Sequence, residues 1–289
     1  MCMRTMFIIL SIVIVSNYAI TGQTKNTTKG NAEITFITNC GFLVQVGDKK
    51  VIFDIESPKT AFDKASLLKA YDLMNKNKSP FNDVDLVMIS HPHDDHLGKK
   101  EITEYLKMNK KVKLISTIDT RDELKKADSV SFTELAQNIF TLDPYDKRES
   151  DIDYNGIKIE SIGMYHFGAP NYVLKDLSFI IEINGIRIFF LSDVDLSYEK
   201  NLTALKEWSK RKGKIDILFS CDVNLFINDY SKNGPNVIKE YINPKNVIAM
   251  HFDPKKVEET EKNVKAFFPN TILFKKSLEK KIIDITGTK

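Results

Sequence analysis

The folded part of the chain opens with short apolar runs that predict β-strands. Apolar residues there recur at every second position or without interruption, as in half-buried and fully buried strands. The expected strands are residues 33–38, 42–46 and 50–55. Turn-forming residues at 39–41 and 47–49 separate them. Residues 61–76 carry apolar side chains along one side at helical spacing and predict a helix.

Strands and helices alternate along the rest of the chain. A buried strand over 84–90 precedes a helix near 98–109, and strand and helix signals follow each other again over 112–127. Two strands, 177–183 and 186–191, are joined by Asn-Gly, which predicts a tight hairpin. The remaining expected elements are strand 157–162, helix 197–211, strand 215–220, helix 234–242, strand 247–250, helix 254–267 and two final strands.

This order predicts one α/β domain over residues 32–289. Runs of strands that alternate with strand–helix repeats fit two mixed β-sheets packed between helical layers better than one parallel sheet. The polar residues 23–31 are expected to form a flexible lead-in. No composition shift marks a second domain boundary.

The first 22 residues have the pattern of a secretory signal peptide. Arg4 gives a positive start, an apolar run covers 7–15, and small residues follow near position 22. The run is short for a bilayer span, which needs about 20 apolar residues. We therefore expect an exported protein, periplasmic or secreted, without a membrane span after cleavage. An uncleaved membrane anchor is the competing interpretation.

The composition is that of an ordinary globular protein, and the net charge argues against nucleic acid as its partner. The 289 residues are 42% hydrophobic and 28% charged, with a net charge of only +3. Phosphate binding normally shows as a larger basic excess. Cys40 and Cys221 lie in apolar, strand-like surroundings and are expected to be inert buried thiols, at no metal-ligand spacing. A disulfide between them stays open at this point.

The most informative segment is residues 90–96, Ser-His-Pro-His-Asp-Asp-His, directly after a buried strand. Imidazole nitrogens and carboxylate oxygens are the ligands that zinc accepts when a site keeps an open position for water. Alternate residues of an extended loop project to the same side, so His91 and His93 can share one ion. Asp95 and His96 then point to a neighbouring position. The segment therefore predicts a metal site.

Two further histidines and two aspartates lie at strand ends. His166 and His251 each come just after a predicted strand, and Asp54 and Asp193 end apolar strands in the same way. Each residue alone has an ordinary explanation, the histidines as satisfied core or loop residues and the aspartates as caps or ion-pair partners. Together with residues 90–96 they make all five histidines of the chain candidate ligands.

These residues, in chain order, resemble the five motifs of the metallo-β-lactamase superfamily. The matching residues are Asp54, His91, His93, Asp95, His96, His166, Asp193 and His251. The resemblance covers residues 33–285. It implies a four-layer αββα sandwich with two metal ions held where the loops of the two sheets meet.

The resemblance also implies a role for each matching residue. The ligands implied for the first ion are His91, His93 and His166. Those implied for the second ion are Asp95, His96 and His251. Asp193 would bridge the ions, and Asp54 would orient the histidine-rich loop through hydrogen bonds. The cofactors implied are two Zn²⁺ ions, with iron or manganese as open alternatives.

The bridging aspartate narrows the class of reaction that the resemblance implies. Members dedicated to β-lactam cleavage generally lack it, whereas lactonases, glyoxalase II-type thioesterases, phosphodiesterases and tRNA 3′ processing nucleases have it. The segments 177–193 and 243–251 are loosely similar to the branch of ascorbate-6-phosphate lactonase and of the phospholipase D that acts on N-acyl ethanolamine lipids.

A longer segment, residues 57–82, replaces a short loop of the family near the site. It has two open interpretations, a packing helix or a lid over a substrate pocket. The residues available to line such a pocket are Phe62, Tyr71 and Phe81, with Phe167 beside His166.

The resulting hypothesis is an exported binuclear zinc hydrolase. A hydroxide that bridges the ions would attack an ester, lactone or phosphodiester, with Asp95 and Asp193 as the catalytic carboxylates. The expected substrate is a small or lipid-derived molecule. β-Lactam amide hydrolysis is an alternative that export favours and Asp193 disfavours. A nucleic-acid-processing phosphodiesterase is another, opposed by export and by the absence of a basic clamp.

Overall fold

The computed structural model describes residues 30–143, 152–168, 174–211 and 213–286. The predicted signal peptide, residues 1–22, lies outside these ranges, and so does the lead-in except for its last two residues. The first strand already begins at Asn31, inside the predicted lead-in. Among the described residues, no helix has the length and apolar character needed to cross a bilayer.

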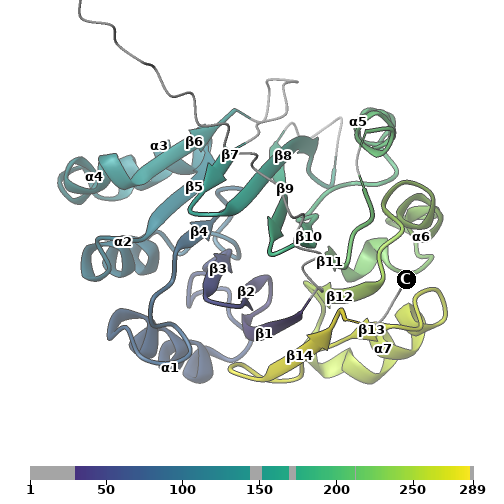
Figure 1. Ribbon diagram of the computed structural model, residues 1–289, viewed down its shortest axis with the longest axis horizontal. Coiled ribbons are helices and arrows are strands. Elements are labelled where there is room, and N and C mark those ends of the chain that lie inside the picture. Colours follow the sequence, from purple (N-terminus) through teal and green to yellow (C-terminus); the bar gives the residue numbers. More distant parts are fainter. Residues whose placement is uncertain (1–29, 144–151, 169–173, 212, 287–289) are drawn as a thin grey trace, which may run out of the picture.

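Two seven-stranded sheets form the centre of the molecule (Figure 1). The first has the order β14-β1-β2-β3-β4-β5-β6. Its strands are β1 Asn31–Thr38, β2 Gly41–Val46, β3 Lys49–Phe53, β4 Leu86–Met88, β5 Lys113–Thr117, β6 Ile139–Leu142 and β14 Lys280–Asp284. The second has the order β13-β12-β11-β10-β9-β8-β7. Its strands are β7 Ile152–Tyr154, β8 Ile157–Tyr165, β9 Lys175–Ile183, β10 Ile186–Phe190, β11 Ile217–Cys221, β12 Asn246–Met250 and β13 Thr271–Ile272.

Both sheets are mixed and follow the same plan. In the first, β14, β1, β2 and β3 pair antiparallel, and β3 to β6 pair parallel. In the second, β7 to β10 pair antiparallel, and β10 to β13 pair parallel. The predicted hairpin between β9 and β10 is present. Asn184 and Gly185 at its turn have φ values of 50° and 79°, which a two-residue type I′ turn requires.

Helices cover the outer face of each sheet (Figure 1). Those on the first sheet are α1 Lys64–Asn75, α2 Lys99–Met108, α3 Ile118–Ala127 and α4 Ser129–Leu135. Those on the second are α5 Glu199–Ser209, α6 Gly234–Val237 and α7 Val257–Lys265. The short helical turns are η1 Ala136–Asn138, η2 Asp222–Asn224, η3 Ile238–Ile242 and η4 Pro254–Lys256. The predicted four-layer αββα arrangement is thus confirmed, and the predicted helix 234–242 is divided between α6 and the π-helical turn η3.

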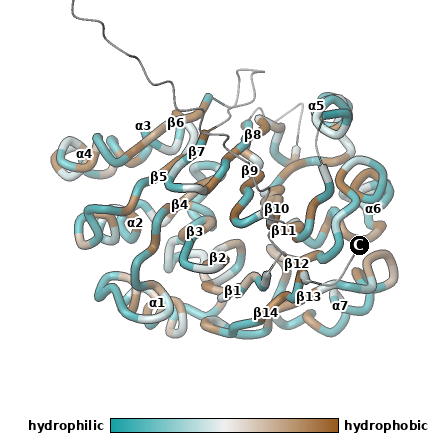
Figure 2. The backbone as a smooth tube through the Cα atoms, in the orientation of Figure 1, coloured by the Kyte–Doolittle hydropathy of each residue, from teal (hydrophilic) through white to brown (hydrophobic). Residues whose placement is uncertain are grey.

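Three apolar clusters fill the three spaces between the four layers. The period of two along each strand sends alternate side chains to opposite faces. In β2, Phe42 and Val44 therefore pack between the sheets, whereas Leu43 packs against the helices of the first layer. In β10, Phe190 packs between the sheets and Phe189 under the outer helices. Along the tube in Figure 2, hydrophobic residues are frequent in the central strands, whereas the outer helices carry both hydrophilic and hydrophobic residues.

Candidate metal centre

The eight predicted site residues meet at one edge of the two sheets. Asp54 follows β3 directly and His91 comes three residues after β4, its parallel neighbour. On the second sheet, Asp193 follows β10, and His251 follows β12. The strands β10, β11 and β12 are parallel, so their carboxyl ends share an edge, the usual place for ligand sites in α/β sheets.

Four residues at this edge turn the backbone sharply in the left-handed region. The φ values are 39° at Asn39, 49° at Asp54, 59° at Ser192 and 58° at His251. This conformation is unfavourable for residues other than glycine and gathers at functional sites. Here it ends each strand abruptly and keeps the following side chains at the site.

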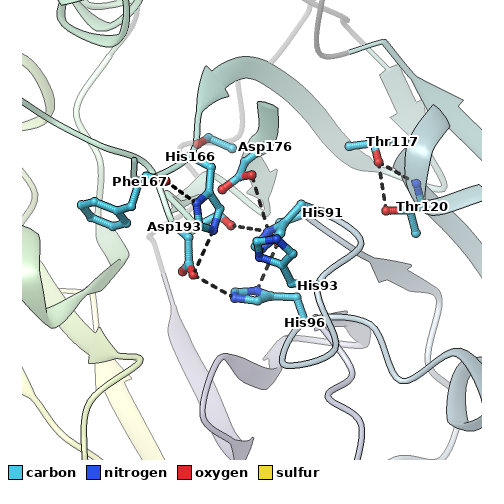
Figure 3. A network of polar contacts seen from close by, with 12 residues as sticks. His91, His93, His96, Thr117, Thr120, His166, Phe167, Asp176 and Asp193 are labelled. Carbon is cyan, nitrogen blue, oxygen red and sulfur yellow. Dashed lines mark hydrogen bonds and ion pairs between the residues drawn. The ribbon is translucent and has the colours of Figure 1, made fainter. Parts of the chain in front are cut away.

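The first histidine group consists of His91, His93 and His166. One ring nitrogen from each lies within 4.8 Å of the other two. The His91 Nε2 and His93 Nδ1 atoms are 3.0 Å apart, and the ring of His166 lies 4.7 Å from the ring of His93 between centroids. The three residues come from both sheets and face one another in Figure 3.

The second group consists of Cys40, His96, Asp193 and His251. One ligand-type atom from each lies within 4.8 Å of the others. Asp95 adjoins this group, because its Oδ2 atom lies 3.0 Å from His251 Nε2 and 3.8 Å from His96 Nε2. The structure therefore brings the three residues predicted for the second ion together, and adds a sulfur atom that was not predicted.

Asp193 lies between the two groups. Its Oδ2 atom is 3.7 Å from His166 Nε2 in the first group. The same atom is 3.2 Å from His96 Nε2 and 3.3 Å from His251 Nε2 in the second. Figure 3 shows the carboxylate between His166 and His96. This is the position that a carboxylate shared by two ions must have.

Hydrogen bonds fix the orientation of His96. Its Nδ1 atom lies 2.6 Å from Asp54 Oδ2. The same carboxylate accepts hydrogen bonds from the backbone N–H of Ser90 at 2.8 Å and from its hydroxyl at 3.0 Å. Because the buried carboxylate holds the proton on Nδ1, Nε2 is left to face the site as an electron-pair donor. Asp54 therefore has the orienting position that was predicted for it.

The other buried histidines are held in the same way. His91 Nδ1 lies 3.0 Å from Ser90 Oγ and 3.6 Å from Asp176 Oδ1, and His166 Nδ1 lies 3.0 Å from the carbonyl oxygen of Phe167. Each contact leaves Nε2 facing the centre. Histidines that bind metals almost always make such a contact with the opposite ring nitrogen.

The charges around the centre favour a bound cation. Burial alone would raise the pKa of Asp95, but the hydrogen bond from His251 and the charge of His96 lower it to about 2. Burial opposes a charge on His251, yet Asp193 and Asp95 raise its pKa to about 9. Burial raises the pKa of Asp176 to about 8. Without an ion, the positive charge of protonated imidazoles balances the negative charge of the carboxylates. A bound metal ion supplies this positive charge in such sites.

The donor set and its spacing fit zinc. Ligands about 2.0–2.1 Å from a tetrahedral ion lie about 3.3 Å from one another. The contacts of Asp193 and Asp95 with the surrounding ring nitrogens span 3.0–3.8 Å. His96 is fully buried, and within the described part of the chain its Nε2 atom makes no hydrogen bond of good geometry, although it lies 3.2 Å from Asp193 Oδ2. A buried nitrogen of this kind costs free energy unless something binds it.

Comparison with known proteins places the chain in a family. The family model described as the β-lactamase superfamily domain matches residues 33–251, which is most of the chain. The chain belongs to the metallo-β-lactamase superfamily. The predicted superfamily is confirmed, whereas the more specific branch stays a prediction.

Individual relatives of this superfamily are distant. A UPF0173 metal-dependent hydrolase of Pyrococcus furiosus is 24% identical over 173 residues, or 53% of this chain and 68% of the relative. The cleavage and polyadenylation specificity factor subunit 3 of Dictyostelium discoideum is 26% identical over 200 residues, or 62% of this chain, but the match spans only 25% of that protein. A metallo hydrolase of Ignicoccus hospitalis has the same fold, with a TM-score of 0.58 at 15% identity, covering 88% of this chain and 99% of the other.

The four aromatic residues that were predicted to line a pocket lie in three different places. Tyr71 and Phe81 are buried in the cluster under α1 and α2, a position that agrees with the packing interpretation of residues 57–82. Phe167 packs at the edge of the cluster between the sheets. Phe62 is 62% exposed and lines a cavity of about 380 Å³.

Sequence reasoning missed three residues that the structure places at the candidate site. Asp176 is fully buried beside His91, but it lies inside β9 in a long buried run without a motif. Ser90 lies within the histidine-rich segment, and its hydroxyl contacts Asp54, His91 and His96. The sequence does not show these contacts, because Asp54 comes from another strand. Cys40 was expected to be an inert buried thiol; it is buried, and its sulfur lies beside the second group. Both Cys40 and Cys221 are free thiols.

Proposed function

We propose that the protein is a metal-dependent hydrolase that binds two zinc ions and cleaves an ester, lactone or phosphodiester. The observation that carries the proposal is the position of Asp193, whose Oδ2 atom contacts ring nitrogens of both histidine groups. A shared carboxylate is the feature that distinguishes a two-ion site from two separate ones. Family membership supports the same conclusion.

Each group of residues has a place in this proposal. The first ion would be held by His91, His93 and His166. The second would be held by Asp95, His96 and His251. Asp193 would be common to both. When bound, such ions polarise the scissile group and lower the pKa of water to about 7.

Asp95 is the residue best placed to move a proton. Its side chain is 27% exposed and that of its partner His251 is 38% exposed, whereas His91 and His96 are fully buried. Substrate therefore approaches from the side of Asp95 and His251. The ionised carboxylate of Asp95 can accept a proton at an oxygen atom and pass it to the leaving group.

A cavity beside the centre supports a small or lipid-derived substrate. Its lining includes Asn39 and Phe252, the chain neighbours of Cys40 and His251. Its aromatic walls are Phe36, Phe62, Phe252 and Phe274. Its charged residues are three lysines and two aspartates: Lys255, Lys275, Lys276, Asp63 and Asp253. At about 380 Å³ the cavity suits a small molecule with an apolar part and a polar or charged group. We further propose that residues 1–22 direct export, so that this substrate is met outside the cytoplasm.

A substrate panel with metal analysis tests the proposal. We expect about two zinc ions per chain, and chelator-sensitive hydrolysis of p-nitrophenyl esters, lactones or bis-p-nitrophenyl phosphate. Asp193→Ala should lose both metal and activity. Asp94→Ala is the matched control, because Asp94 lies in the histidine-rich loop beside Asp95, but its side chain faces Lys99 at 3.9 Å. Metal-free protein with full activity would overturn the proposal. Preferred cleavage of a chromogenic cephalosporin or of RNA would replace its substrate class by the β-lactam or nucleic-acid alternative.

A further inference from the structure

The unassigned sulfur of Cys40 lies at the centre rather than in an ordinary core position. Cys40 is fully buried in the turn between β1 and β2. Its Sγ atom belongs to the compact set of ligand-type atoms with His96, Asp193 and His251, all within 4.8 Å of one another. A buried thiol that only fills space in a core packs against apolar side chains. Cys40 does so on the side of the cluster between the sheets, but its sulfur also meets these three polar side chains.

The backbone holds the Cys40 turn against two other ligand segments. The His251 backbone N–H donates to the carbonyl oxygen of Asn39 at 3.4 Å. On the other side of Cys40, a Cβ atom at Gly41 would lie 3.2 Å from the carbonyl oxygen of Asp54, so a larger residue would push the turn away. The position of the sulfur is therefore set by the same segments that position His251 and Asp54.

The second thiol of the region has a different partner. Cys221 Sγ donates to Asp193 Oδ1 at 2.8 Å. The other oxygen of that carboxylate, Oδ2, faces the histidines. Cys221 thus holds Asp193 from behind, and its sulfur is not part of the ligand-type set that includes Cys40.

A second observation at this place indicates a ligand. His96 is fully buried, and within the part of the chain that the structure describes its Nε2 atom makes no hydrogen bond of good geometry; it meets only carboxylate oxygens, Asp193 Oδ2 at 3.2 Å and Asp95 Oδ2 at 3.8 Å. Asp54 directs that nitrogen toward the space that Cys40, Asp193 and His251 surround. One imidazole, one carboxylate, a second imidazole and a sulfur then face the same point. Zinc accepts all of these donors, with sulfur at about 2.3 Å and nitrogen at about 2.0–2.1 Å.

We propose that Cys40 is an additional ligand of the second ion, bound as a thiolate after its proton has passed to solvent. This proposal rests on the two-ion site of the proposed function. A thiolate favours zinc and other thiophilic ions over magnesium, calcium or manganese. The second position therefore selects its metal through Cys40, while the all-nitrogen first group does not depend on sulfur.

Cobalt substitution tests this assignment by a signal that does not depend on activity. A thiolate bound to Co²⁺ gives an intense near-ultraviolet charge-transfer absorption, which nitrogen and oxygen ligands do not give. The full chain contains three cysteines. We expect the absorption in the wild-type protein and in the Cys2→Ser/Cys221→Ser variant, in which Cys40 is the only thiol. We expect Cys40→Ser to lose it and to bind the second Co²⁺ at least tenfold more weakly.

The outcomes separate the two proposals. A protein that binds no cobalt contradicts the proposed function itself. A protein that binds two cobalt ions without the absorption, or that keeps it in Cys40→Ser, overturns only the role of Cys40. If Cys40→Ser fails to fold, the Cys2→Ser/Cys221→Ser variant still decides, because its absorption can come from no other cysteine. Loss of the absorption in that variant would likewise overturn the assignment.

Discussion

Replacing Asp54 by asparagine tests how the site orients His96. Asparagine has the same shape as aspartate and tolerates the left-handed backbone found at position 54, where φ is 49°. The carboxylate accepts from Ser90 N–H through Oδ1 and from His96 Nδ1 through Oδ2. An amide has only one acceptor oxygen, so one of these two donors must face an NH₂ group. If that donor is His96, its proton moves to Nε2 and blocks the metal-facing nitrogen.

The expected size of this effect follows from the contacts. Loss of a buried partner behind a metal-binding histidine typically weakens metal binding about 10- to 100-fold. This corresponds to about 1.4–2.8 kcal/mol of binding free energy. The Asp54 carboxylate is fully buried, and its bond to His96 is short at 2.6 Å, so we expect a value toward the upper end.

Competition with a chromophoric chelator measures the affinity of each ion in the wild-type protein and in Asp54→Asn. Ser90→Ala is the matched control, because it removes one hydrogen bond to Asp54 but leaves the charge beside His96. For the second ion we expect a smaller loss in Ser90→Ala than in Asp54→Asn. Asp54→Asn should leave the affinity for the first ion unchanged, whereas Ser90→Ala also removes the partner of His91 Nδ1 and should weaken binding of the first ion. Equal affinity of Asp54→Asn and the wild type for both ions would refute the reasoning.

Three further expectations concern stability. Zinc at 100 times its dissociation constant should stabilise the folded state by about 2.7 kcal/mol. Chelation should therefore lower the melting temperature by about 5–11 °C. An unchanged melting temperature would show that zinc does not bind the folded state. Phe53 stacks on Phe190 with centroids 4.7 Å apart, so Phe53→Ala should cost about 3–5 kcal/mol in urea unfolding, and a cost below 1 kcal/mol would contradict the packing. Asp63 caps α1 through the N–H of Ser66, so Asp63→Ala should cost about 1 kcal/mol at neutral pH. Hydrogen bonds from Ser66 hold the pKa of Asp63 below its usual value. The stability difference between the wild type and Asp63→Ala should therefore persist above about pH 4 and shrink as the pH falls through the lowered pKa. A stability difference that stays constant down to about pH 2 would contradict this cap.

The sequence predicted what local chemistry determines. The hairpin at Asn184 and Gly185 follows from two residues that accept positive φ values, and it is present where expected. The strand-end positions of Asp193 and His251 were visible because an apolar run stops just before each of them. A ligand pattern in consecutive residues needs no knowledge of the fold, which is why the histidine-rich segment indicated a metal site directly.

The missed features depend on contacts between distant segments. Tyr71 lies on a helix whose apolar face could meet either a sheet or a substrate, and only packing against the first sheet decides between them. Asp176 lies in a strand that is buried on both faces, so the alternation of polar and apolar residues could not distinguish it as a site residue. Cys40 acquires its neighbours from residues 96, 193 and 251, and no spacing in the chain encodes that meeting.

The origin of the ligands in both sheets gives the proposed ions a mechanical role. Residues 91–96 extend from the first sheet, whereas His166, Asp193 and His251 extend from the second. Ions held by both sets would tie the two halves of the sandwich together at one end, much as a cross-link does. Loading with zinc should then slow amide hydrogen exchange in β3 and β4 and in β10 and β12 together, and its removal should loosen both sheets at that end at once.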